Sequence, residues 1–378
     1  MPILSKIREI KKFLSSHKPL IEIFVYKQNL LGNLHGYKKN YPGLQFAPVL
    51  KANAYGHGLE QVLSILKSED LPFICVDSHF ELRIAGKYAP KLQALVIGFA
   101  RFESIAKSDF NRTAFIISSL EQLAELSGKL RNPKRFHLKL DTGMHRQGIL
   151  PEDFQQAVKS ITANKNIRLQ GLCSHLAEPE NEAETQKQIQ SWNSAVKYFR
   201  NTFSNIQYTH LSATGGLRYS QNIDANLARL GIGFYGIDSY RQTWPNLKPA
   251  LEMRSLITGI KTIEAGEKVG YGLTFKAKEK MNVATVPVGY FEGLDRRLGN
   301  RGFFKLDSEF CPVVGRLSMD IATIDVSANK KAAFMSEVVV ISAQSSDKNS
   351  VENLAGLCET LPYEILVHLP AHLKRTIV

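Results

Sequence analysis

Lys51 follows a run of apolar residues and opens the string KANAYGHG, residues 51–58. A lysine at the end of a buried strand is partly desolvated, which favours the neutral amine that forms a Schiff base with a carbonyl group. The glycines of the string allow a tight turn, and the hydroxyl of Tyr55 can reach an anion. A single lysine before a turn is usually a solvated surface charge, so its function depends on what the rest of the chain places around it.

Eight short apolar segments alternate with segments of helical character and predict a parallel (β/α)8 barrel. The predicted strands lie at 46–51, 72–77, 94–99, 113–118, 136–141, 169–175, 208–213 and 227–232. Helical character is clearest at 119–129 and 183–203. Chemistry in such barrels occurs at the C-terminal ends of the strands. We therefore expect Lys51, His175, Thr214 and the pair Gly231 and Ile232 to converge on one mouth.

The pattern changes beyond about residue 240, where strands and turns dominate and long helices are few. This change predicts a second domain of mainly β type. The expected organisation is a basic extension at 1–17, a barrel at 18–242 and a mainly β domain at 243–378. The first strand, near 20–26, is a candidate to pair with the C-terminal domain.

The composition is that of an ordinary globular chain, with 378 residues of which 44% are hydrophobic and 22% charged. No segment approaches the ~18 apolar residues of a membrane span. The N-terminus, MPILSKIREIKKFLSSHK, is basic and amphipathic and lacks the features of a signal peptide. These features predict a cytoplasmic protein without membrane association.

The distribution of charge argues against a nucleic-acid-binding protein, and the spacing of the cysteines argues against a zinc or disulfide protein. The net charge is +13, but the lysines and arginines are scattered and no nucleic-acid-binding motif organises them, so a solvated basic surface is the simpler interpretation. The four cysteines are widely spaced and form no CxxC pair, which argues against a zinc site and a disulfide framework. We expect them to be buried free thiols.

Four strings occur in an order that is typical of one family. They are KANAYGHG at 51–58, LKLDTGMHRQG at 138–148, VPVGYFEGLDRRLGNRG at 286–302 and VVGRLSMD at 313–320. Together they make the chain, from about residue 19 to its C-terminus, resemble the alanine racemases, fold-type III enzymes that use pyridoxal 5'-phosphate (PLP). The resemblance implies two-base racemisation of L- and D-alanine, which supplies D-alanine for the peptidoglycan of the bacterial cell wall.

The resemblance also implies roles for single residues. Lys51 would carry the cofactor and act as the base for the D-isomer, and Tyr271, in VGYGLTF, would be the opposite base for the L-isomer. A phenol is a weak base unless nearby cations favour its phenolate. Arg229 matches the arginine that faces the pyridine nitrogen; because arginine keeps its proton, the ring nitrogen stays unprotonated. His175 and His210 match histidines that link this arginine towards the tyrosine.

The segment Gly231–Gly236 is formally a GxGxxG string. A dinucleotide site would need a following helix and an acidic residue ~20 positions further on. The next residues, IDSYRQTWP, do not fit, so we reject that interpretation. The family instead uses the residues that match Gly231 and Ile232, together with Tyr55 and Thr214, to hold the PLP phosphate.

The remaining matches concern the substrate. Lys139 matches a lysine that CO2 often carbamylates, and the resulting anion would orient Arg146 towards the cofactor's phenolic oxygen and the substrate carboxylate. Met319 and Asp320 match residues of the second domain that border the substrate, with the Met319 amide donating to its carboxylate. Tyr290 matches a tyrosine at the entrance. Because the second domain completes the neighbouring subunit's site in this family, the resemblance implies a head-to-tail homodimer.

Three features depart from the family pattern. Ala213 and Thr214 stand where the family usually has asparagine and serine, and His145 stands where glycine is common. The C-terminal YEILVHLPAHLKR lacks an aromatic hydroxyl that some members place on the phosphate. These departures concern cofactor affinity and substrate range.

Several alternatives remain open. The nearest is a broad-specificity racemase acting on lysine, arginine or serine, although the retained Lys139 favours alanine. A decarboxylase of the same two-domain fold and a non-catalytic PLP carrier fit less well, the first because such enzymes are longer and the second because carriers resemble the barrel alone. Nucleic-acid binding driven by the +13 charge is the remaining alternative.

Overall fold

The computed structural model describes residues 18–239 and 247–378. The chain divides into two compact units at two points, between Val25 and Tyr26 and between Ala250 and Leu251. Tyr26–Ala250 is called the barrel unit here. Residues 18–25 and Leu251–Val378 together are called the β unit. The basic extension expected at 1–17 lies outside the described residues.

Eight strands of the barrel unit run parallel to one another. They are β2 (Gln45–Pro48), β3 (Ile74–Val76), β4 (Ala94–Val96), β5 (Thr113–Ile117), β6 (Lys134–Lys139), β7 (Ile167–Cys173), β8 (Tyr208–His210) and β9 (Leu227–Leu230). Strands β3 to β8 form one sheet in chain order, and β2 pairs with β9. A bridge between Val49 and Cys75 joins β2 to β3, and the amide of Asn226, directly before β9, donates to the Thr209 carbonyl of β8 (3.2 Å). The predicted barrel is thereby confirmed.

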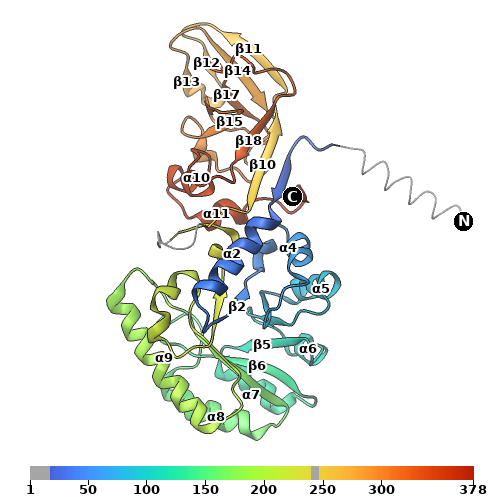
Figure 1. Ribbon diagram of the computed structural model, residues 1–378, viewed down its shortest axis with the longest axis vertical. Coiled ribbons are helices and arrows are strands. Elements are labelled where there is room, and N and C mark those ends of the chain that lie inside the picture. Colours follow the sequence, from blue (N-terminus) through green and yellow to red (C-terminus); the bar gives the residue numbers. More distant parts are fainter. Residues whose placement is uncertain (1–17, 240–246) are drawn as a thin grey trace, which may run out of the picture. The chain divides into compact units, whose positions relative to one another are not determined.

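Helices surround these strands (Figure 1). They are α2 (Lys27–Asn40), α3 (Lys51–Tyr55), α4 (Leu59–Leu66), α5 (His79–Tyr88), α6 (Phe102–Ala106), α7 (Leu120–Lys129), α8 (Phe154–Ala163) and α9 (Glu182–Thr202), with short 3-10 helices η1 (Pro151–Asp153), η2 (Thr214–Asn222) and η3 (Ile232–Tyr235). Polar caps start three of the long helices. Ser78, Ser119 and Asn181 each accept a hydrogen bond from the amide three residues further on, at 3.2–3.3 Å, as N-cap residues do.

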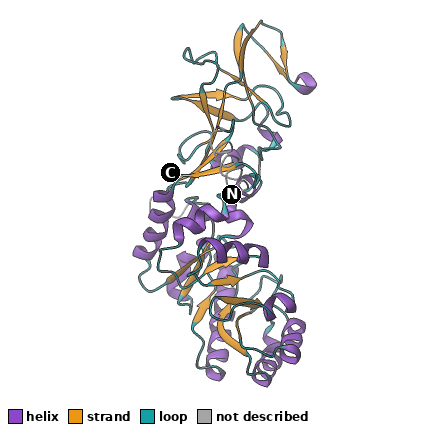
Figure 2. Cartoon of the chain, turned by 90° about the vertical axis from the view of Figure 1, so that its right-hand side faces the viewer, coloured by secondary structure: helices purple, strands orange, loops and turns teal. Residues whose placement is uncertain are grey.

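The β unit contains more strand than helix (Figure 2). Its largest sheet has the order β16 (Glu309–Pro312), β15 (Phe303–Leu306), β18 (Glu337–Ile341), β10 (Leu251–Leu256), β1 (Glu22–Val25) and β19 (Lys374–Ile377). The other elements are β11 (Gly259–Ile263), β14 (Met281–Val286), β17 (Ala322–Asp325), β12 (Lys268–Val269), β13 (Phe275–Lys276), η4 (Tyr271–Leu273), η5 (Arg296–Leu298), α10 (Val351–Leu357) and α11 (Pro362–Val367). Strand β1 pairs with both β10 and β19, so the segment before the barrel lies in this sheet.

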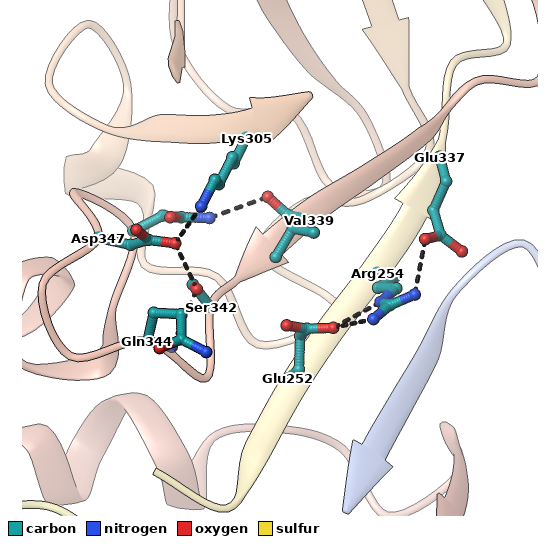
Figure 3. A network of polar contacts seen from close by, with 9 residues as sticks. Glu252, Arg254, Lys305, Glu337, Val339, Ser342, Gln344 and Asp347 are labelled. Atoms are coloured by element: carbon teal, nitrogen blue, oxygen red, sulfur yellow. Dashed lines mark hydrogen bonds and ion pairs between the residues drawn. The ribbon is translucent and has the colours of Figure 1, made fainter. Parts of the chain in front are cut away.

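Polar contacts between charged side chains hold the centre of that sheet (Figure 3). Arg254 on β10 binds Glu252 on the same strand at 2.5 Å and Glu337 on β18 at 2.7 Å. The buried carboxylate of Asp347 accepts from Lys305 on β15 at 2.8 Å and from the Ser342 hydroxyl at 2.7 Å. The first set of contacts joins β10 to β18, and the second joins β15 to the loop after β18.

All four cysteines are free and buried, which confirms the prediction of buried thiols. Within residues 18–239 and 247–378, no helix has the length and apolar character needed to cross a membrane.

Candidate active site

Lys51 begins a left-handed turn. The residues after it, Ala52, Asn53, Ala54 and Tyr55, have φ between 51° and 56°, and Gly56 follows at 77°. For residues other than glycine this conformation costs roughly 1–2 kcal/mol each. Such a run persists only where the surroundings hold it in place, and it occurs most often at functional sites.

The first barrel strand ends earlier than expected. The sequence placed Lys51 at the strand end, but β2 stops at Pro48. The chain stays anchored to both neighbours as it leaves the barrel, because the Val49 amide donates to the Leu230 carbonyl and the Leu50 amide to the Cys75 carbonyl, each at 2.8 Å. Lys51 therefore emerges from a fixed point just beyond the strand.

The predicted phosphate-binding residues lie next to one another. A Cβ on Gly231 would come within 3.1 Å of the Tyr55 hydroxyl, and one on Gly233 within 2.6 Å of the Thr214 methyl. The Gly233 amide donates to the Thr214 hydroxyl at 3.2 Å. Gly231 and Ile232 directly follow β9. A Cβ at 233 would overlap Tyr37 and Thr214, whereas one at 231 would make a tight contact with the Tyr55 hydroxyl.

Arg229 is almost fully buried and forms hydrogen bonds to several segments of the barrel. One terminal nitrogen donates to Nδ1 of His210 and to its carbonyl (2.8 Å). The other donates to the Ser174 carbonyl at 2.6 Å and to Nδ1 of His175 at 3.2 Å. No carboxylate in the described part of the chain forms an ion pair with it. A buried cation without a counter-ion favours an anionic or acceptor-rich ligand.

The hydrogen bonds determine the tautomers of two buried histidines. Because Nδ1 of His210 accepts from Arg229, its proton must be on Nε2, which donates to Nδ1 of His137 at 2.7 Å. Burial, aided by the charge of Arg229, lowers the pKa of His137 to about 3 and that of His210 well below its ordinary value. The chain from Arg229 through His210 to His137 therefore remains neutral at both imidazoles.

Four cations lie close enough to His175 to perturb it. Burial is the main reason why its pKa falls to about 3, followed by the positive charges of Arg229, Arg146, Lys139 and Lys51. The four predicted cationic residues therefore lie around one imidazole.

The free energy of unfolding at acid pH should depend on His137, His175 and His210. Each has a folded pKa below its unfolded value of 6.5, so the unfolded chain binds more protons as the pH falls below 6.5, and stability present above that value is lost. Three such groups give a slope of up to about 4 kcal/mol per pH unit. The raised pKa of Glu81 acts in the opposite direction, but it is a single group.

Urea unfolding measured between pH 6.5 and 4.5 checks this expectation. His137→Gln should reduce the slope of stability against pH by roughly a third, because one of the three buried imidazoles is lost. An unaltered slope in His137→Gln would contradict the argument.

Lys139 and Arg146 lie at and after the end of β6 in the barrel unit. Lys139 donates to the Gln147 side chain at 3.1 Å. Its pKa is lowered, first by burial and then by the charges of Arg229 and Arg146. His145, which departs from the family pattern, has φ of 52°, the conformation for which glycine is best suited.

Tyr271 stands at the tip of a hairpin in the β unit. Strands β12 and β13 pair on either side of η4, and Gly270 and Gly272 both have positive φ. Asn300 holds the hairpin by donating to the Thr274 hydroxyl (3.0 Å) and accepting from the Gly315 amide (2.6 Å). The Tyr271 side chain is 73% exposed.

Tyr290 and Met319 lie on two adjacent loops of the β unit. The Tyr290 amide donates to the Ser318 carbonyl at 3.2 Å, and the Phe291 amide to the Met319 carbonyl at 2.9 Å. Among the described residues, none accepts a hydrogen bond from the Met319 amide, and Asp320 next to it is exposed. These loops leave a backbone donor open to a ligand.

Two residues beside the predicted site were not identified from the sequence. His137 supports His210, and Glu81 accepts hydrogen bonds from the backbone next to Lys51. A signal for Glu81 was present, because Ser78 and Glu81 have the S-x-x-E spacing of a capping box. The sequence carries no comparable signal for His137, whose partner is distant in the chain.

The fold and the site together define an enzyme whose (β/α)8 barrel carries a lysine at its mouth and whose chain continues into a mainly β unit. Two family profiles match the chain: the alanine racemase N-terminal domain over residues 25–239 and the alanine racemase C-terminal domain over 250–377. The chain belongs to the alanine racemase family.

Individual relatives agree with this assignment. An alanine racemase of Syntrophobacter fumaroxidans is 31% identical over 337 residues, covering 86% of this chain and 88% of the relative. One of Borreliella burgdorferi is 28% identical and covers 96% and 98% of the two chains. The solved alanine racemase of Clostridium difficile superposes with a TM-score of 0.86 at 26% identity, covering 96% of this chain and 97% of that one.

Proposed function

We propose that the protein is a PLP-dependent alanine racemase that interconverts L- and D-alanine. The observation that carries this proposal is the placement of Lys51 just after β2, Lys139 at the end of β6 and Arg229 on β9, where Arg229 donates to His175 just after β7. It indicates that the proposed cofactor lysine and the cations suited to a carboxylate share one mouth of the barrel. Supplying D-alanine for peptidoglycan in the cytoplasm would then be the biological role.

The residues present fit PLP. Lys51 offers the amine. Tyr55, Thr214, Gly231 and Ile232 would hold the phosphate, because the glycine backbone at 231 lies beside the Tyr55 hydroxyl and that at 233 beside the Thr214 hydroxyl. Arg229, which is buried and has no carboxylate partner within residues 18–239 and 247–378, would face the ring nitrogen. When bound, PLP withdraws electrons from the substrate Cα and makes its proton removable.

The protein residues would supply the proton transfers. Lys51 would remove or return the Cα proton on one face of the substrate and Tyr271 on the other. Arg229 cannot release its proton and is held by Ser174, His175 and His210, so it would donate a fixed hydrogen bond and protonate nothing. Arg146 and the Met319 amide would bind the substrate carboxylate.

We also propose a head-to-tail homodimer in which the β unit of one copy completes the site of the other. The support is a set of exposed large apolar side chains on loops of the β unit: Tyr271, Leu273, Tyr290, Phe291, Met319 and Ile321. Large exposed apolar patches typically mark an interface or a ligand site.

The test is an assay of the purified protein, with added PLP, against a panel of L-amino acids followed by chiral analysis of the products. Formation of D-alanine well above all other D-isomers is the expected result. Faster turnover of lysine, arginine or serine would make the protein a broad-specificity racemase. Carbon dioxide release would indicate a decarboxylase, and bound PLP without any turnover a carrier.

Lys139 should carry a carbamate. Its lowered pKa makes the neutral amine, the form that reacts with CO2, more accessible than at an exposed lysine. The product is an anion beside Arg146, and Lys139→Ala should lower kcat/KM by at least about tenfold because Arg146 loses that partner.

Nuclear magnetic resonance with isotope-labelled bicarbonate checks this prediction. A carbamate signal should be present in the wild type and in Lys129→Ala, an exposed control, and absent in Lys139→Ala. A signal that persists in Lys139→Ala would assign the carbamate to another lysine.

A further inference from the structure

Glu81 lies in α5, which follows the second barrel strand, yet its carboxylate reaches the turn that carries Lys51. One oxygen accepts from the Ala52 amide at 2.9 Å and the other from the Asp77 amide at 2.6 Å. The side chain is buried. A single carboxylate thus joins the end of β3 to the first residue after Lys51.

The bond to Asp77 is a local cap, and the chain contains a matched case. Ser78 and Glu81 begin α5 as Ser119 and Gln122 begin α7, and each serine accepts from the amide three residues on. Gln122 closes its own cap by accepting from the Ser118 amide at 3.0 Å. An amide side chain is therefore sufficient for this local task.

The second bond explains why a carboxylate stands at 81. Two backbone N–H groups point at the side chain, and each needs an acceptor. A carboxylate provides two acceptor oxygens, whereas a glutamine provides one oxygen and a nitrogen that would face an N–H donor. Nothing in the helix cap itself requires the additional oxygen.

The segment that Glu81 holds is the left-handed run from Ala52 to Gly56. Several of its other bonds join residues close in the chain. The Ala54 amide donates to Leu50, the Gly56 amide to Ala52 and the Gly58 amide to Asn53, whose side chain accepts from the Leu59 amide. Glu81 fastens the beginning of this run, directly after Lys51, to a different barrel strand.

We propose that Glu81 is a positioning residue for Lys51. By binding the Ala52 amide it fixes the left-handed turn, and that turn fixes the direction in which the Lys51 side chain extends from the backbone. This inference rests on the proposed function, because it assumes that Lys51 carries PLP. It adds a residue that neither contacts the cofactor nor transfers a proton.

Glu81→Gln is the central variant and Gln122→Ala the control, since the latter removes a capping side chain of the same motif without touching the Lys51 turn. In full-length protein without cofactor, hydrogen exchange of the Ala52 amide should become roughly tenfold faster in Glu81→Gln and stay unchanged in Gln122→Ala. The Kd for PLP, followed by its visible absorbance, should rise at least about tenfold only in Glu81→Gln.

The outcomes separate the possibilities. The proposal is overturned if both variants lose the same thermal stability while Glu81→Gln keeps the wild-type hydrogen exchange of Ala52 and the wild-type Kd for PLP. Glu81 would then act only as a helix cap. If the wild-type protein binds no PLP, the proposed function fails, while the exchange comparison still tests the contact. Should Glu81→Gln not fold, Glu81→Asp, whose shorter side chain cannot span both amides, is measured in the same way.

Discussion

Lys51→Ala should abolish covalent PLP binding and lower alanine racemisation by at least about 10⁴-fold. The substitution removes both the amine that holds the cofactor and the proposed base for the D-isomer. The visible absorbance of the lysine-bound cofactor and the rate of D-alanine formation are the two measurements. Alanine fits the space of the shortened side chain, so the unfolding midpoint of the cofactor-free protein should change little.

Lys67→Ala is the matched control, because Lys67 is exposed at the end of α4 in the same unit. It should keep wild-type absorbance and activity. Retained covalent cofactor in Lys51→Ala would move the cofactor to another lysine, and Lys139 would then be examined first.

Tyr271→Phe should lower racemisation by about 10²–10⁴-fold, the usual contribution of one general acid–base group. Only the hydroxyl is lost from a side chain that is largely exposed in the β unit, so folding should be unaffected. The two enantiomers should respond differently. In heavy water, D-alanine should still exchange its Cα proton through Lys51, whereas exchange from L-alanine should be lost.

Tyr198→Phe on α9, which removes a hydroxyl from a surface helix, serves as the control and should exchange both enantiomers normally. Equal exchange from L- and D-alanine in Tyr271→Phe would show that the opposite base is another group.

Mixing the two defective proteins tests the shared site. In a head-to-tail dimer, one copy with Lys51→Ala and one with Tyr271→Phe form one doubly defective site and one site with both residues intact. Activity should therefore return on mixing and subunit exchange. Mixtures that stay inactive, although exchange is verified, would mean that both residues act within one chain or that no such dimer forms.

The sequence was sufficient to predict the barrel and the mainly β character of the C-terminal part of the chain. Apolar strand segments alternating with amphipathic helices have few packing solutions, and strands such as β5 and β7 lie close to their predicted positions. The starts of helices can be predicted from sequence as well, because Ser119 and Asn181 begin α7 and α9 through local hydrogen bonds. Such patterns depend only on residues that are close to one another in the sequence.

The strings around Lys51 and Arg229 also pointed to the site from sequence alone, because the C-terminal ends of parallel strands meet at one mouth. The predicted end of the first strand was less accurate. Strand β2 stops at Pro48, and beyond it Val49 and Leu50 bind Leu230 and Cys75, which are distant in the chain and which no local pattern reveals.

Only the tertiary structure determined what holds the site residues in place. The tautomers of His210 and His137 follow from hydrogen bonds between β9, β8 and β6, and no local pattern encodes such pairs. The same is true of Glu81, whose sequence shows a helix cap but whose second oxygen binds the Ala52 amide, 29 residues earlier in the turn of Lys51. Sequence periodicity records which face of an element is buried; the particular donor that meets a particular acceptor is decided when distant strands close into a barrel.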